Sequence, residues 1–183
     1  MRARWIVAAA AVIAVLVVGA SWFVFDRTRQ HPFPEVDAAG LNERQTRVVE
    51  LLRAEHAANP GGAKYSEGVR EPWCANFVSW IMREAGAPLA NPNSGHWRIP
   101  GVYTLTEFYQ KAQLFQPRDG AYEPKVGDVV LYSPSSKYGQ HTNIVVRNDS
   151  GRLTTVGGNE GLGVVGVRVV DTTHAGIVGY GVL

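Results

Sequence analysis

Two kinds of segment follow one another along this chain, and their order restricts the folds open to it. Residues 41–59 and 72–86 carry apolar side chains at helical spacing and end at Gly or Pro, and a third helix is predicted at 105–112. From Val126 onward the pattern changes to short apolar runs typical of strands, such as VGDVVLYS, HTNIVVRN and VVGVRVVDT. The turn Asn148-Asp149-Ser150-Gly151 predicts that two of these strands are antiparallel. Helices first and strands afterward predict an α+β domain, with helices packed on one face of an antiparallel sheet.

Charge and composition narrow the class of protein. The chain has 183 residues, of which 45% are hydrophobic, and no repeat at a fixed period, which favours one globular domain with an appendage. Arg2 and Arg4 account for the net charge of +2, so the rest of the chain is formally neutral. A neutral chain without a Lys/Arg run lacks the clustered charge that supplies most nucleic-acid affinity, so we expect no nucleic-acid partner.

The appendage is residues 1–25, in which Trp5 to Phe25 form an uncharged run of 21 residues. A run of this length can cross a bilayer as one helix, and the arginines before it predict that the N-terminus stays in the cytoplasm. A cleavable signal peptide is the alternative, because Val18-Gly19-Ala20 resembles a small-residue cleavage site. Residues 26–40 are then a linker, and residues 41–183 form a domain outside the cytoplasm, either tethered to the cell membrane by a single pass or secreted.

Cys74 is the only cysteine of the chain, and it lies at the predicted start of the second helix. An exported protein with one cysteine offers it no internal disulfide partner, so the thiol is either a small buried hydrophobe or a reactive group. Unpaired N–H groups and the helix dipole favour a thiolate at a helix N-terminus. Val78 and Ile81 share its helical face, which directs the sulfur toward the predicted sheet. Both interpretations stay open from this residue alone.

A reactive thiol needs a base, and His141 is the best placed of the five histidines. The stretch YGQHTNIVV puts it at the start of a strand, from where its ring can project toward a helix terminus. Taken alone, a histidine in this position is more simply explained as a polar strand-end residue. A cysteine at a helix start and a histidine at a strand start together form the arrangement that a thiol nucleophile and its general base require.

Five motifs in series give the chain a resemblance to the CHAP domain, the cysteine- and histidine-dependent amidohydrolase/peptidase family with a papain-like fold. They are WCANFVSWIMREAG, PKVGDVVLY, GQHTNIVV, TTVGGN and GIVGYG, and the similarity spans roughly residues 45–183. The resemblance implies that Cys74 is the nucleophile and that His141 is the base that activates it.

The third catalytic position is where the chain departs from this family. Where the family often has Glu, Gly, Asn, this chain reads Gly157-Gly158-Asn159, followed by Glu160. Asn159 is therefore the candidate to orient the imidazole through its second nitrogen. Glu160 is the second choice, because it is more simply explained as a solvated loop charge. Trp73 and Trp97 are weaker candidates for a substrate cleft, with packing in the core as the alternative.

The resemblance implies acyl transfer through a thioester, with an amide bond of bacterial peptidoglycan or its peptides as the substrate. We expect no metal and no cofactor, because the chain has no HExxH motif, no Cys/His ligand set and no acidic calcium loop. Two alternatives remain open. The chain could be a catalytically inactive CHAP-like module that binds the wall, or a cysteine peptidase that acts on an exported protein.

Overall fold

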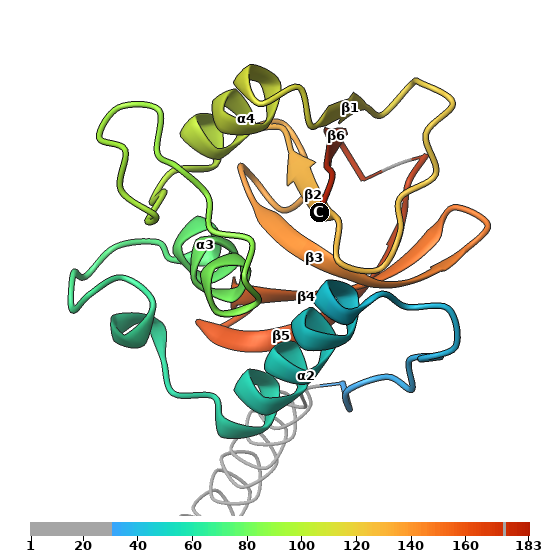
Figure 1. The fold of residues 1–183 in the computed structure, drawn as a ribbon, viewed down its shortest axis with the longest axis horizontal. Coiled ribbons are helices and arrows are strands. Elements are labelled where there is room, and N and C mark those ends of the chain that lie inside the picture. The colour runs from blue at the N-terminus through green and yellow to red at the C-terminus, as the bar shows by residue number, and fades with distance from the viewer. Residues whose placement is uncertain (1–30, 174) are drawn as a thin grey trace, which may run out of the picture. The chain divides into compact units, whose positions relative to one another are not determined.

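The computed structural model describes residues 31–173 and 175–183, and the predicted α+β architecture is confirmed in this part of the chain. Helices come first along the chain and are followed by a six-stranded sheet (Figure 1). The helices are α2 (Glu43–Ala58), α3 (Cys74–Glu84) and α4 (Val102–Lys111), with a short 3-10 turn, η1 (Gly62–Lys64), between the first two. The strands are β1 (Phe115–Pro117), β2 (Val129–Tyr132), β3 (Thr142–Asp149), β4 (Arg152–Glu160), β5 (Val164–Asp171) and β6 (Ile177–Gly181).

The sheet has the strand order β1-β6-β2-β3-β4-β5, and every neighbouring pair is antiparallel. The predicted hairpin joins β3 to β4, where Asp149 pairs with Arg152 and leaves Ser150 and Gly151 as a two-residue loop. Both loop residues have positive φ angles, 51° and 91°, as a type I′ turn requires. The edge strand β1, which the sequence pattern does not predict, extends the sheet beyond β6.

Helices cover one face of this sheet, where α3 packs on β3 and β4, and α2 packs on β5 (Figure 1). The buried side of α3 is apolar, and Phe77, Val78 and Ile81 are fully buried in the main core. Gly158 of β4 lies against the start of this helix, so close that a Cβ there would be 2.5 Å from Phe77 Cβ. This close approach brings the N-terminus of α3 to the ends of β3 and β4.

The opposite face of the sheet carries a second, smaller apolar cluster. Its members are Val130, Tyr132, Val145, Leu153, Val170, Ala175, Ile177 and Tyr180, with Tyr122 and Tyr138 from loops packed against them. Because both faces are covered, all four residues of β2 are buried. This explains why the run VVLY is continuously apolar rather than alternating.

The predicted membrane span at residues 1–25 lies outside the described residues, as does the first part of the predicted linker. In residues 31–173 and 175–183, no helix is long and apolar enough to cross a membrane. The described end of the linker packs against the domain: Phe33 and Val36 lie on the main core, and Phe33 meets the ring of His56 edge-on. The compact unit accordingly begins at Pro32.

Candidate active site

Cys74 is the first residue of α3 and is only 5% exposed. The helix starts at this residue rather than at Pro72, and Trp73, which occupies the N-cap position, makes no side-chain hydrogen bond to the first turn. The backbone N–H groups of that turn, including the N–H of Cys74, therefore have no cap from the residue that usually supplies one. These N–H groups can donate hydrogen bonds to an anionic oxygen bound next to the Cys74 sulfur.

His141 immediately precedes β3, and its buried side chain is hydrogen-bonded to Glu160 and lies close enough to Cys74 for the cysteine to raise its pKa. Glu160 Oε1 lies 2.8 Å from His141 Nε2. Because a carboxylate accepts, Nε2 carries a proton, and Nδ1 is the ring nitrogen left for the sulfur. The backbone of β2 holds the residue in place, since the carbonyl of His141 accepts from the N–H of Tyr132 at 3.0 Å. The structure thus brings Cys74, His141 and Glu160 together in one buried site, with a hydrogen bond between the last two.

Glu160, rather than Asn159, contacts the imidazole. Glu160 is only 5% exposed, which corrects its explanation as a solvated loop charge. Asn159 has a left-handed φ of 60°, and the register between β4 and β5 shifts between Gly157 and Glu160. Such a β-bulge redirects the side chain that follows it, and here the carboxylate is directed at His141. The position of Asn159 in the sequence motif carries no information about this bulge.

Two glycines make room for the Glu160 side chain. Gly157 and Gly166 are paired across β4 and β5. A Cβ at Gly157 would lie 2.6 Å from Glu160 Oε1, and a Cβ at Gly166 would lie 3.0 Å from Glu160 Cβ. Arg168, two residues further along β5, binds the other carboxylate oxygen, Oε2, through Nε at 2.9 Å and through a closer contact from Nη2. Each oxygen of Glu160 therefore has its own partner.

The surroundings of His141 favour a protonated imidazole. Burial lowers the pKa of His141, but the interaction with Cys74 and the hydrogen bond and negative charge of Glu160 outweigh this effect and raise the pKa to about 9. Burial raises the pKa of Glu160, but the hydrogen bond and charge of His141, followed by those of Arg168, hold it below its usual value. At neutral pH the site therefore holds an imidazolium next to a carboxylate.

The two tryptophans predicted for a cleft lie in different environments. Trp73 is 6% exposed and stacks on Tyr65, with ring centroids 5.2 Å apart and planes 14° apart. It is buried in the main core, which is the alternative that the sequence left open for this residue. Trp97 is half-buried on the loop before α4, where the guanidinium of Arg83 lies 4.0 Å from its ring centroid.

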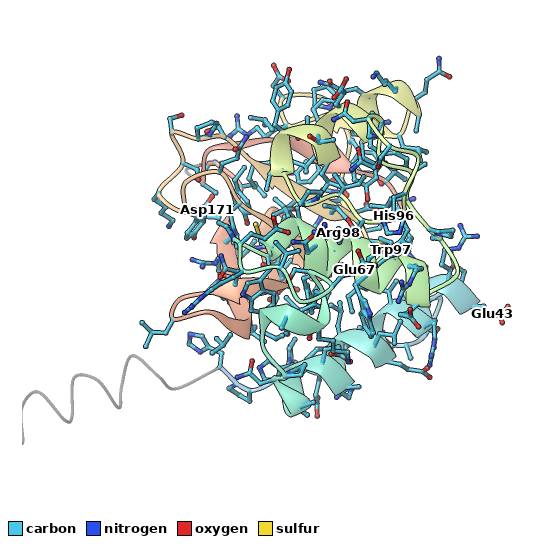
Figure 2. The ribbon with its side chains drawn as sticks, turned by 90° about the vertical axis from the view of Figure 1, so that its left-hand side faces the viewer. Glu43, Glu67, His96, Trp97, Arg98 and Asp171 are labelled. Carbon is cyan, nitrogen blue, oxygen red and sulfur yellow. The ribbon has the colours of Figure 1, made fainter. Side chains whose placement is uncertain are left out.

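Arg98, next to Trp97, holds the segment that leads into Cys74. Its Nη1 lies 2.6 Å from Glu71 Oε1 and 3.2 Å from Asn76 Oδ1, and its Nε lies 3.2 Å from Glu67 Oε2. Asn76 is fully buried in the first turn of α3 and donates to the same Glu71 oxygen at 2.9 Å. Figure 2 shows Arg98 beside Glu67 and Trp97 on one side of the molecule. The cluster therefore links the turn before Cys74 to the loop that carries Trp97.

Sequence reasoning missed Arg98 and Arg168, because neither belongs to a recognisable motif. Arg168 follows Gly166 by two residues, so the two lie on the same face of a predicted strand. This spacing is the sequence feature that could have pointed to Arg168. In the described part of the chain, no group of three or more His, Cys, Asp and Glu side chains is arranged to hold a metal ion.

Comparisons with known proteins bear on the family and on the fold. The family model described as the CHAP domain matches residues 64–159, and this family is in general one of peptidoglycan-related amidases and peptidases. No curated protein matches the chain. A solved structure titled "The crystal structure of Ly7917" has a similar fold, with a TM-score of 0.51 and 17% sequence identity. The similarity covers 75% of this chain and 62% of that chain, so this chain spans under two thirds of that protein.

Proposed function

Because the chain belongs to the CHAP domain family, we propose that it is a cysteine amidase or endopeptidase that cleaves amide bonds in the peptides of bacterial peptidoglycan. The observation that carries the proposal is the buried group of Cys74, His141 and Glu160, in which Glu160 is hydrogen-bonded to His141 and Cys74 raises the pKa of the same imidazole. It joins a nucleophile, a proton carrier and an orienting carboxylate, which are the parts that thiol-dependent acyl transfer requires.

The proposed reaction starts from a Cys74 thiolate paired with the His141 imidazolium. The sulfur attacks the amide carbonyl carbon, the carbonyl electron pair moves to oxygen, and the N–H groups at the start of α3 stabilise the oxyanion. His141 then protonates the leaving nitrogen through Nδ1, the C–N bond breaks and a thioester remains. Neutral His141 next takes a proton from water, whose oxygen attacks the thioester, and the sulfur leaves as the thiolate with the imidazolium restored.

Glu160 has two roles in this proposal. Its Oε1 accepts from Nε2, which holds the ring in the tautomer and orientation that present Nδ1 to the sulfur. Its charge also stabilises the imidazolium that forms when the thiol gives up its proton. The presence of this carboxylate argues against the alternative of an inactive wall-binding module.

The test uses the full-length protein in detergent, incubated with purified peptidoglycan. We expect new primary amines to be released, and mass spectrometry of the fragments identifies the bond that is cut. Cys74→Ala should lower the rate by at least about 10³-fold, because the attacking atom is removed. Equal release by the wild type and by a folded Cys74→Ala variant would refute a cysteine-dependent reaction.

The same experiment separates the alternatives. Binding of both proteins to the wall without release of amines would favour the inactive module. Cleavage of an exported protein, with peptidoglycan left intact, would favour the protein-specific peptidase.

We also propose that residues 1–25 anchor the chain in the cell membrane, with the catalytic domain outside the cytoplasm. An uncharged run of 21 residues from Trp5 to Phe25 supports this location. The full chain should stay with membranes during alkaline carbonate extraction, and its intact mass should include residues 1–25. A mass that corresponds to a chain beginning after Ala20 would instead identify a cleaved signal peptide and a secreted enzyme.

A further inference from the structure

We propose that Arg168 is a positioning residue of this active site, which holds Glu160 in the orientation that His141 needs. The inference rests on the proposed function, because it assigns Arg168 a role in the same reaction. It adds a fourth residue to the site formed by Cys74, His141 and Glu160.

The first support is the division of the Glu160 oxygens. Oε1 is bound to His141 Nε2, while Oε2 is bound to both Nε and Nη2 of Arg168. The terminal torsion of a glutamate has no sharp preferred angle, so the side chain alone does not fix which oxygen faces the ring. A guanidinium that binds one oxygen with two planar donors removes that freedom.

The second support is the way Arg168 itself is held. Its guanidinium lies over the ring of Tyr138, 3.9 Å from the ring centroid, which is a cation–π contact. Tyr138 packs edge-on against Tyr132, with ring centroids 5.2 Å apart. Both tyrosines adjoin the histidine: Tyr138 is three residues before His141, and the Tyr132 ring lies 6.1 Å from the imidazole. Arg168 thus connects Glu160 to the segment that leads into His141.

The third support is charge balance in a buried site. The side chains of Glu160 and Arg168 are 6% and 26% exposed, so water screens this pair only partly. An ionised carboxylate at this depth needs a cationic partner even when the imidazole is neutral. Arg168 is such a partner in every protonation state of His141, because a guanidinium keeps its charge. The ionisable groups that face the imidazole from the packed elements are Cys74 from α3, Tyr132 from β2 and Glu160 from β4, with Arg168 and Tyr138 behind Glu160.

Cys74 provides a readout that needs no peptidoglycan. It is the only cysteine, so the rate at which the full-length protein reacts with iodoacetamide reports its thiolate directly. At pH 6.5 we expect Arg168→Gln to slow alkylation by about 10- to 100-fold, the range that follows from misplacing a catalytic group. Arg168→Lys keeps the charge without the fork, so it should react at an intermediate rate.

A double mutant separates positioning from a general effect on the fold. In a Glu160→Gln background, Arg168→Gln should cause no additional slowing, because the arginine acts through the carboxylate. The matched control is Arg147→Gln, which removes a half-exposed arginine of β3 that pairs with Asp149, and it should react like the wild type. Melting temperatures show whether each variant is folded. If Arg168→Gln does not fold, the alkylation rate of Arg168→Lys still tests the proposal.

Two results would overturn the role of Arg168. One is an Arg168→Gln or Arg168→Lys protein that is alkylated as fast as the wild type. The other is an equal slowing by Arg168→Gln with and without Glu160→Gln, which is the behaviour of a merely structural residue. A wild-type Cys74 that reacts no faster than a free thiol would instead refute the reactive thiolate on which the proposed function depends.

Discussion

The substitution Glu160→Gln removes one charge from the active site and preserves the size of the side chain. Burial of His141 lowers its pKa, and the contacts with Cys74 and Glu160 together raise it to about 9. Without the carboxylate charge, we expect this pKa to fall toward the ordinary histidine value of about 6.5, while the interaction with Cys74 remains. At pH 7.5 the protonated fraction of the imidazole would then drop from nearly all toward about one tenth, the fraction at a pKa of about 6.5. Any step that needs the imidazolium should slow by up to about tenfold at that pH.

The assay is the pH dependence of kcat/KM for peptidoglycan hydrolysis between pH 5 and pH 10. The wild-type profile should decline on the alkaline side near pH 9, where His141 loses its proton, and the decline of the Glu160→Gln profile should shift to lower pH, toward about 6.5. The matched control is Glu50→Gln, which changes a side chain that is 61% exposed on α2 and should keep the wild-type profile. Loss of one partner from a buried ion pair destabilises a protein by about 3–5 kcal/mol, but the position of the decline does not depend on how much protein is folded. An unchanged alkaline limb in Glu160→Gln would refute the reasoning.

Three further predictions concern the surroundings of the site. Gly157→Ala should lower activity at least about tenfold and stability by about 1–3 kcal/mol, because its Cβ would overlap the Glu160 carboxylate. Thermal melts and hydrolysis kinetics measure the two effects. The control is Gly101→Ala, whose Cβ meets nothing closer than 3.8 Å. Arg98→Met should lower the free energy of unfolding by about 1–3 kcal/mol, because its partners Glu71 and Asn76 lose their hydrogen bonds to the guanidinium. An unchanged free energy of unfolding in urea denaturation would contradict the linking role of Arg98. The stability lost in Glu160→Gln should depend on pH. The raised pKa of His141 contributes stability that is complete below about pH 6.5 and disappears as the pH rises through about 9, whereas the lowered pKa of Glu160 contributes stability that is present above about pH 4.5 and lost in acid. The difference between the wild type and Glu160→Gln should therefore be largest between about pH 4.5 and 6.5, and a difference that grows toward pH 9 would contradict the pairing.

The sequence by itself determines the order of elements and the nature of the site. Helical spacing, strand-like runs and the Asn148–Gly151 turn predict helices followed by an antiparallel sheet, and these are local properties that neighbouring residues encode. The same local signals put Cys74 at a helix start and His141 at a strand start. Both placements follow from residues within one turn of helix or a few positions of strand.

Tertiary structure alone decides what surrounds that pair. Glu160 reaches His141 because of a bulge between β4 and β5, and its side chain fits because Gly157 and Gly166 happen to be paired across those strands. Arg168 joins the carboxylate from the neighbouring strand, and Trp73 is buried because Gly158 lets α3 approach the sheet. Each of these contacts depends on the register of one strand against another, and register is set by the packing of the whole sheet rather than by any single segment.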